Sequence, residues 1–166
     1  FDNDIPKEIY PFGKKKYQIP KSSKVKKALT NNELKVLFNA IPKTAEQEKA
    51  KDFWFFSYTC NGMNNKDIAL LKYSDFEGDK FSYYRAKTFS KSRTKTKIEI
   101  YLNEYSDGVI KKYGTGNSDG YVFPVLDRND DEEIIYKKIK NFTRFINQHL
   151  KKLAQDNNIT DEISSY

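Results

Sequence analysis

Six cationic side chains and no acidic one lie between residues 85 and 97, and they are the group best suited to chemistry on an anion. A second run, residues 14–27, contains seven cations and no acid. Ammonium and guanidinium groups hold phosphate oxygens through charge-assisted hydrogen bonds. The acidic residues gather elsewhere, within 46–48, 127–133 and 156–162. The pattern therefore predicts a basic face that binds a polyanion, and an acidic remainder.

The composition indicates one folded domain. A chain of 166 residues can bury a core of its own, and 15% aromatic residues argue against disorder. The net charge of +7 agrees with a polyanionic partner. The single cysteine, Cys60, excludes an internal disulfide and a cysteine zinc cluster, so we expect it to pack as a small apolar residue. No apolar run approaches the roughly 20 residues of a membrane span, so no membrane partner is expected.

Residues 1–29 are predicted to form an interdomain linker. Four residues interrupt any helical period there, namely Pro6, Pro11, Gly13 and Pro20. Several apolar residues could anchor the segment, and these are Ile9, Tyr10, Phe12, Tyr17 and Ile19. Such anchors favour a linker that follows a preceding domain over a disordered tail.

Three helices are predicted in the first half of the domain. Thr30 and Glu33 fit a capping box, and the helix they open should bury one face made of Leu34, Leu37, Phe38 and Ile41. A second capping box, Thr44 with Gln47, should open another helix. Its apolar positions are crowded, so it should lie centrally, and it should stop at Gly62. Asn64 or Asn65 should then cap a short helix over 66–72.

The second half should contain a hairpin and a long helix. Residues 80–86 and 96–102 alternate as strands, with a polar and basic loop between them. A helix over 103–113, a loop over 114–120 and an extended piece over 121–124 should follow. The long helix, from 131 to about 155, should bury a stripe of Ile135, Ile139, Phe142, Ile146, His149 and Leu153. These elements predict an α+β fold, mostly helical with a small antiparallel sheet.

The order of these pieces resembles the catalytic domain of the tyrosine recombinases, the phage integrase family. Residues 62–71 are similar to the family motif Gly-hydrophobic-Arg-x-x-Glu/Asp-hydrophobic-x-x-Leu, and Arg85-Ala-Lys87-Thr88 resembles the Arg-x-Lys-Thr at the end of the family's second strand. The resemblance covers 30–166, and the linker is similar to that of Bacteroides-type mobile-element integrases. It implies that 30–166 is the N-terminal part of an integrase catalytic domain.

The sequence departs from the family at the first phosphate-binding arginine. Asn64 occupies that slot, and Asn61 occupies the alternative slot before the glycine. An asparagine can donate a neutral hydrogen bond but supplies no charge, so Arg85 or Arg93 would have to lend a cation. Asp67 fits the acidic slot, where it would brace the backbone, although it could equally be a solvated helix residue.

The resemblance implies a site-specific recombinase that breaks and rejoins DNA through a 3′-phosphotyrosyl intermediate. Lys87 would then be a general acid, and Asn64 the degenerate arginine position. Double-stranded DNA would contact residues of the hairpin and the linker, namely Arg85, Thr88, Lys91, Arg93, Lys95, Lys24, Lys26 and Lys27. No metal or nucleotide cofactor is expected. The full-length protein would act as a homo-oligomer on DNA in a bacterial cytoplasm.

The family's His-x-x-Arg motif and nucleophilic tyrosine are expected beyond Tyr166, so we expect this piece alone to be inactive. His149 should pack against its helix rather than act in catalysis. Two alternatives remain open. One is a DNA-binding accessory protein on the same scaffold that has lost its chemistry. The other is a basic RNA-binding module whose Tyr83, Tyr84 and Phe89 stack on unpaired bases.

Overall fold

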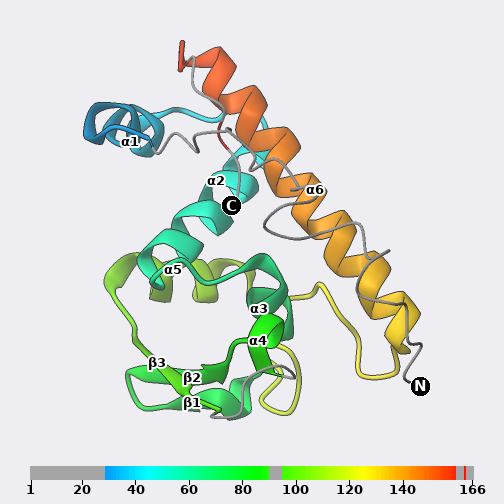
Figure 1. The fold of residues 1–166 in the computed structure, drawn as a ribbon. Coiled ribbons are helices and arrows are strands. Elements are labelled where there is room, and N and C mark those ends of the chain that lie inside the picture. The colour runs from blue at the N-terminus through cyan, green and yellow to red at the C-terminus, as the bar shows by residue number, and fades with distance from the viewer. Residues whose placement is uncertain (1–28, 90–94, 160–162, 164–166) are drawn as a thin grey trace, which may run out of the picture.

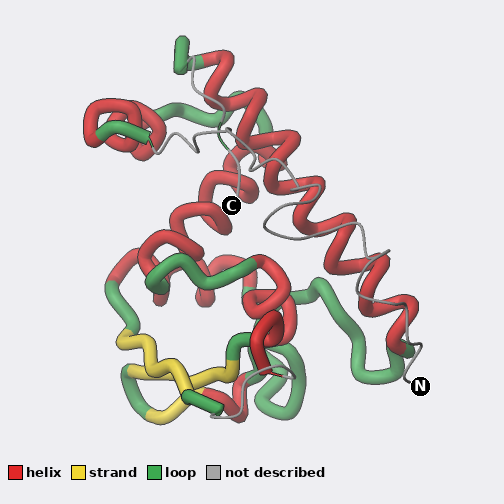
Figure 2. The backbone as a smooth tube through the Cα atoms, viewed as in Figure 1, coloured by secondary structure: helices red, strands yellow, loops and turns green. Residues whose placement is uncertain are grey.

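The computed structural model describes residues 29–89, 95–159 and 163. The predicted linker therefore lies outside the described residues, except for Leu29. The helices are α1 (Asn31–Asn39), α2 (Ala45–Thr59), α3 (Asn65–Leu70), α4 (Ala86–Phe89), α5 (Glu104–Tyr113) and α6 (Glu132–Asp156), with a 3₁₀ turn η1 (Tyr73–Asp75). The strands β1 (Phe76–Glu77), β2 (Lys80–Tyr84) and β3 (Lys97–Tyr101) form one antiparallel sheet. The predicted α+β class is confirmed (Figures 1 and 2).

The helix starts are set by side-chain caps. The Thr30–Glu33 capping box is complete. Thr44 accepts the N–H of Gln47, but the Gln47 side chain accepts from Lys43 and donates to Asp156 instead of closing a second box. Asn64 caps α3, Asn103 caps α5 and Asp131 caps α6. Local sequence therefore fixed the starts of the predicted helices to within a residue or two.

The turn after α2 depends on glycine. The helix ends at Thr59, and Asn61 and Gly62 both take positive φ, at 57° and 71°. Two consecutive left-handed residues reverse the chain so that α3 can start at once. Glycine adopts this conformation without the steric cost that a Cβ imposes.

Helix α1 buries less than its sequence predicts. Leu37 is fully buried, whereas Phe38 is 48% exposed and Ile41 is 82% exposed. Helix α1 lies at the edge of the molecule (Figure 1), so part of its apolar face stays exposed to solvent. Phe38 still makes an edge contact with Phe55, with ring centroids 5.1 Å apart. The predicted four-residue face is therefore wrong for its outer members.

The sheet follows the predicted hairpin, with shorter strands. Phe81 pairs with Ile100 in the β2–β3 register, and both face the core. Ala86 belongs to α4, which was not predicted, and β1 was missed because two residues cannot show a period of two. Tyr83, offered above as a stacking residue, is half-buried against the core.

Two apolar clusters support these elements. The larger joins α2, α3, the sheet, α5 and the first half of α6, and includes Cys60, whose pKa is raised to about 12 by burial. The smaller joins α1, α2 and the end of α6. Along α6, Ile135 and Ile139 are only half-buried, and His149 packs against the ring of Phe145. Of the helices described, none combines the length and apolar character that crossing a membrane requires.

Candidate nucleic-acid interface

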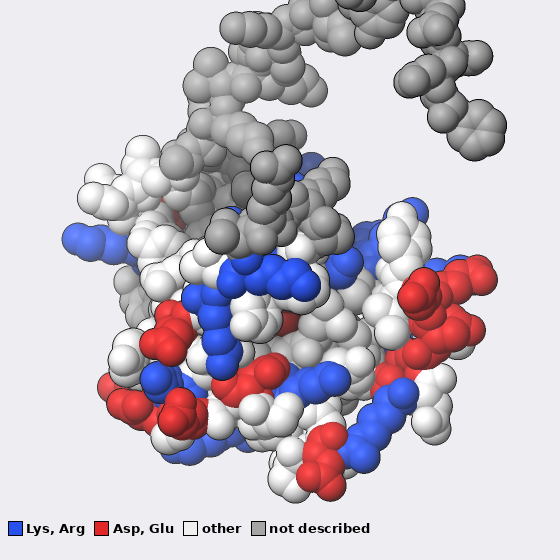
Figure 3. All heavy atoms as spheres, turned by 60° about the horizontal axis from the view of Figure 1, so that its bottom comes forward, with Lys and Arg blue, Asp and Glu red and all other residues white. Residues whose placement is uncertain are grey.

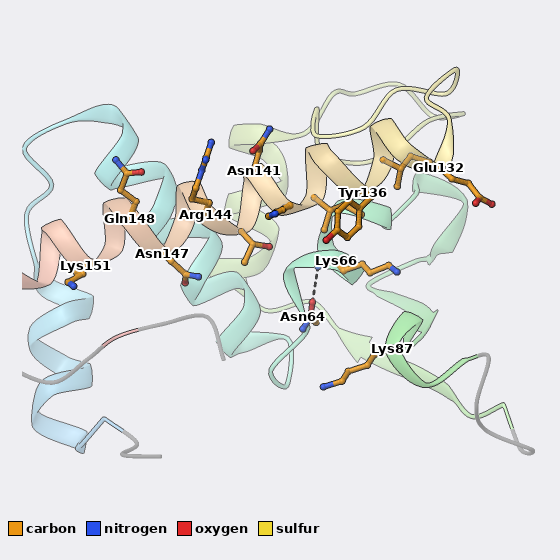
Figure 4. Close-up of a pocket in the computed structure, with 14 residues that line it drawn as sticks. Asn64, Lys66, Lys87, Glu132, Tyr136, Asn141, Arg144, Asn147, Gln148 and Lys151 are labelled. Atoms are coloured by element: carbon orange, nitrogen blue, oxygen red, sulfur yellow. Dashed lines mark hydrogen bonds between the residues drawn. The ribbon is translucent and has the colours of Figure 1, made fainter. Parts of the chain in front are cut away.

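A groove of about 1230 Å³ runs between α6 and the segments that begin α3 and form α4 (Figure 4). We name it the α6 groove. One wall carries Asn64, Lys66 and Lys87, and the other carries side chains of α6. Among the described residues that line it, the cations are Lys66, Lys87, Lys140, Arg144 and Lys151, and the one acidic residue is Glu132. The structure therefore brings the two predicted catalytic positions, Asn64 and Lys87, to one basic surface.

Asn64 has a structural task as well as a place at the groove. Its Oδ1 accepts the backbone N–H of Lys66 at 2.9 Å, which caps α3. The Nδ2 amide has no partner among the residues that the structure describes. It can donate one neutral hydrogen bond to an anion in the groove. An arginine at this position could not cap the helix, because its side chain has no acceptor.

Asp67 connects α3 to α4, the two helices that form the wall of the groove opposite α6. It is 4% exposed, and its Oδ1 accepts the backbone N–H of Ala86 at 2.9 Å. Ala86 immediately precedes Lys87, so the bond fixes α4 relative to α3. The structure thus shows the brace that the acidic slot implied, and the alternative of a solvated residue is wrong. The Oδ2 atom is buried without a hydrogen-bond partner in the described part of the chain.

Replacement of Asp67 by asparagine should change how stability depends on pH. Burial raises the pKa of the Asp67 carboxyl, against the opposing effects of the Ala86 N–H and of Arg85 and Lys66. The native state then holds this proton more tightly than the unfolded state, so Asp67 destabilises the fold as pH rises through its native pKa. Asp67→Asn keeps an acceptor for Ala86 and removes the titration.

We therefore expect the stability of Asp67→Asn relative to the parent to rise from about pH 4 toward pH 7. Urea unfolding of both proteins at several pH values measures it. A difference in free energy of unfolding that is constant over this range, or that falls, contradicts a raised pKa.

Lys87 lies on α4 and not on a strand, which corrects the expected position at the end of β2. Helix α4 is a single turn, and the Lys87 side chain is exposed. In Figure 4 the Lys87 side chain extends toward the space beside Asn64. A flexible ammonium there can approach a phosphate that the Asn64 amide also contacts.

Both walls of the α6 groove carry cations that have no acidic partner among the described residues. Lys66, Lys87, Lys140, Arg144 and Lys151 form no ion pair with any described residue. Their neighbours on α6 differ, because Lys137 pairs with Glu133 and Lys152 with Asp156. Asn147 and Lys151 lie on the side of α6 nearer Asn64, while Asn141, Arg144 and Gln148 point away from it (Figure 4). Arg144 therefore belongs to the rim of the groove.

The other predicted DNA contacts lie apart from the groove or outside the described residues. Arg85, Thr88 and Lys95 line a second, smaller hollow beside the hairpin. Arg85 is therefore not among the described residues that line the α6 groove beside Asn64. Lys91, Arg93, Lys24, Lys26 and Lys27 lie outside the described residues.

The predicted division into a basic face and an acidic remainder is too coarse. Figure 3 shows basic and acidic side chains next to one another on the face that carries the sheet. Several of these charges neutralise each other, as where Lys80 pairs with Glu77 and Glu99. The α6 groove differs from this face, because its described lining holds five cations and one acidic residue.

Sequence reasoning missed Lys66, Lys140, Arg144 and Lys151 as candidates. A signal for the three on α6 was present, since residues 134–155 contain no acid. Lys140 and Lys151 also lack an acidic residue three or four positions away, whereas Lys137 and Lys152 have one. Unpaired helical cations opposite an apolar stripe would have indicated an anion-binding face.

Within the described part of the chain, no three His, Cys, Asp or Glu residues gather as a metal site would require. Comparison of the chain with protein-family models, with curated proteins and with solved structures found no match. Membership of the tyrosine recombinases therefore stays a prediction from the resemblance of the sequence motifs.

Proposed function

We propose that this chain binds duplex DNA along the α6 groove as part of a tyrosine recombinase, which breaks and rejoins DNA through a 3′-phosphotyrosyl intermediate. One observation supports this above the others. Asn64 and Lys87, matched to the family's phosphate-binding and general-acid positions, line the same groove as four further cations that have no ion-pair partner among the described residues. Such a protein would act in the bacterial cytoplasm, where the DNA is.

The spread of charge favours a polymer over a small anion. Lys140 and Lys151 lie on the same side of α6, eleven residues apart, which is about 16 Å along the helix axis. Lys66 and Lys87 carry positive charge on the opposite wall. A single phosphate cannot contact groups so far apart, whereas a DNA backbone presents phosphates at each step. Neutral donors between the cations, such as Thr143 and Asn147, suit phosphate and sugar contacts.

The chemistry at Asn64 and Lys87 follows from their side chains. A phosphoryl transition state spreads negative charge over its oxygens, which fixed donors stabilise. Asn64 would donate one neutral hydrogen bond, and Lys87 would protonate the leaving 5′ oxygen. The sequence contains no His-x-x-Arg motif. We therefore expect this 166-residue chain to bind DNA without forming a covalent adduct.

Binding to duplex DNA should weaken when one groove cation is neutralised. Each phosphate contact contributes about 0.9 to the slope of log affinity against log salt, or roughly eightfold in affinity at 0.1 M salt. The Lys140→Gln variant should bind the duplex about eightfold more weakly and flatten the slope of log affinity against log salt by about one unit. Fluorescence anisotropy with a labelled duplex at several salt concentrations measures both quantities.

Lys137→Gln is the matched control, because Lys137 lies one turn away on α6 and pairs with Glu133. It should leave the slope unchanged. If the two variants change the slope equally, binding reflects overall charge and the groove assignment fails.

A second candidate is an accessory DNA-binding protein that has lost catalysis, and the neutral Asn64 favours it. The two candidates differ in covalent chemistry. A nicked suicide duplex, incubated with the whole recombinase to which we expect this chain to belong, traps a protein–DNA adduct if the enzyme is active. Duplex binding without an adduct supports the accessory protein.

A further inference from the structure

The hairpin carries a second hollow, of about 250 Å³, that the α6 groove does not include. It lies between the end of β2, α4 and the start of β3. Two aromatic residues, Tyr84 and Phe89, and two cations, Arg85 and Lys95, line it. No acidic residue is among the described residues around it. Aromatic faces next to cations are the combination that binds unpaired nucleotides.

Both rings are more exposed than a role in the core would require. Tyr84 is 47% exposed and Phe89 is 40% exposed. Their centroids lie 5.4 Å apart with the planes tilted by 59°, so a base cannot enter between them. It can stack on the outer face of one ring and meet the edge of the other. The neighbouring Tyr83, by contrast, packs against the core.

The cation at this hollow is held by a contact that a base could replace. The Lys95 ammonium lies 4.2 Å from the centroid of the Phe89 ring. An exposed cation–π contact of this kind is weaker than the stacking of a base on the same ring. A base that took this place would leave the flexible Lys95 side chain within reach of the phosphate of the same nucleotide. Arg85 and Thr88 also line the hollow. The Thr88 hydroxyl makes only a long hydrogen bond of 3.4 Å to the Arg85 carbonyl, which a phosphate oxygen would replace.

We propose that the hollow formed by Tyr84, Phe89 and Lys95 binds one unpaired nucleotide of DNA, with its base on an aromatic ring and its phosphate on the cations. The choice of DNA rests on the proposed function, because an enzyme that exchanges strands must pass through a stage with bases outside a helix. The stacking chemistry itself rests on the geometry of the hollow.

The test compares a fully paired duplex with the same duplex carrying one bulged adenine, by fluorescence anisotropy. The parent chain should bind the bulged duplex about tenfold more tightly, the gain expected from one stacked base. Phe89→Leu should remove most of this preference and leave affinity for the paired duplex within about twofold. A bulged 2-aminopurine should lose fluorescence on binding the parent and keep it with Phe89→Leu.

Tyr101→Leu is the control, since Tyr101 is a 64% exposed tyrosine on β3 that does not line the hollow. It should keep the preference for the bulge. Equal affinity of the parent for both duplexes overturns the proposal, as does an equal loss on both with Phe89→Leu. Tighter binding of a bulged RNA than of the bulged DNA overturns the assignment to DNA.

The same data separate this proposal from the proposed function. Binding of the bulged duplex through Phe89 with no affinity for the paired one contradicts the α6 groove as a duplex site and supports the nucleotide site. Salt-sensitive binding of the paired duplex through Lys140, with no preference for the bulge, supports the α6 groove as a duplex site and contradicts the nucleotide site.

Discussion

Reversing the charge of Lys140 and Lys151 together should lower the affinity for duplex DNA about a hundredfold at 0.1 M salt. Loss of two phosphate contacts removes roughly eightfold each, and repulsion by the new carboxylates adds to this. Both residues are exposed, so Lys140→Glu with Lys151→Glu should leave the fold intact. Anisotropy titrations with a labelled duplex measure the affinity, and circular dichroism checks that the helix content is unchanged.

The matched control changes the net charge by the same amount on the same helix. Lys137→Glu with Lys152→Glu alters two exposed lysines that pair with Glu133 and Asp156 and do not line the groove. This variant should lose less than about tenfold, because only the long-range field changes. Comparable losses in both double variants would show that α6 has no specific DNA-binding side.

Most of the fold could be predicted from local sequence because its elements are set by local signals. Thr30, Asn64, Asn103 and Asp131 cap their helices as residues of their type do. What failed was burial, which depends on neighbours far along the chain. The stripe of Leu34, Leu37, Phe38 and Ile41 has helical spacing, but nothing in it says that α1 lies at an edge.

The candidate site was predictable only in part. The motif match gave Asn64 and Lys87, which lie on the same wall because the buried Asp67 holds α4 against α3. The opposite wall comes from α6, some fifty residues further along the chain, and its position depends on packing against α2. Sequence spacing carries no information on which of two helical sides faces a distant turn, so Lys140 and Lys151 were missed.

Phe53 lies at the centre of the packing between α2, α5 and α6, so its truncation should destabilise the fold strongly. Phe53→Ala should lower the free energy of unfolding by about 3–5 kcal/mol. Phe53 is fully buried, and its ring meets Phe123 and Phe142 edge-on at 4.9 and 5.0 Å. It also stacks on Tyr113 at 5.4 Å. One side chain of α2 thus contacts α5, the segment after it and α6, so no single movement can fill the cavity.

Urea unfolding at pH 7 measures the change, with Tyr58→Ala on the same helix as the control. Tyr58 is 54% exposed and should cost less than about 1 kcal/mol. Because 3–5 kcal/mol is a large part of the stability of a small domain, Phe53→Leu provides a milder variant. The loss in free energy of unfolding for Phe53→Leu should lie between the losses for Tyr58→Ala and Phe53→Ala. If Phe53→Ala costs no more than Tyr58→Ala, α2 is not the core of this domain, and the placement of α6 opposite Asn64 loses its physical basis.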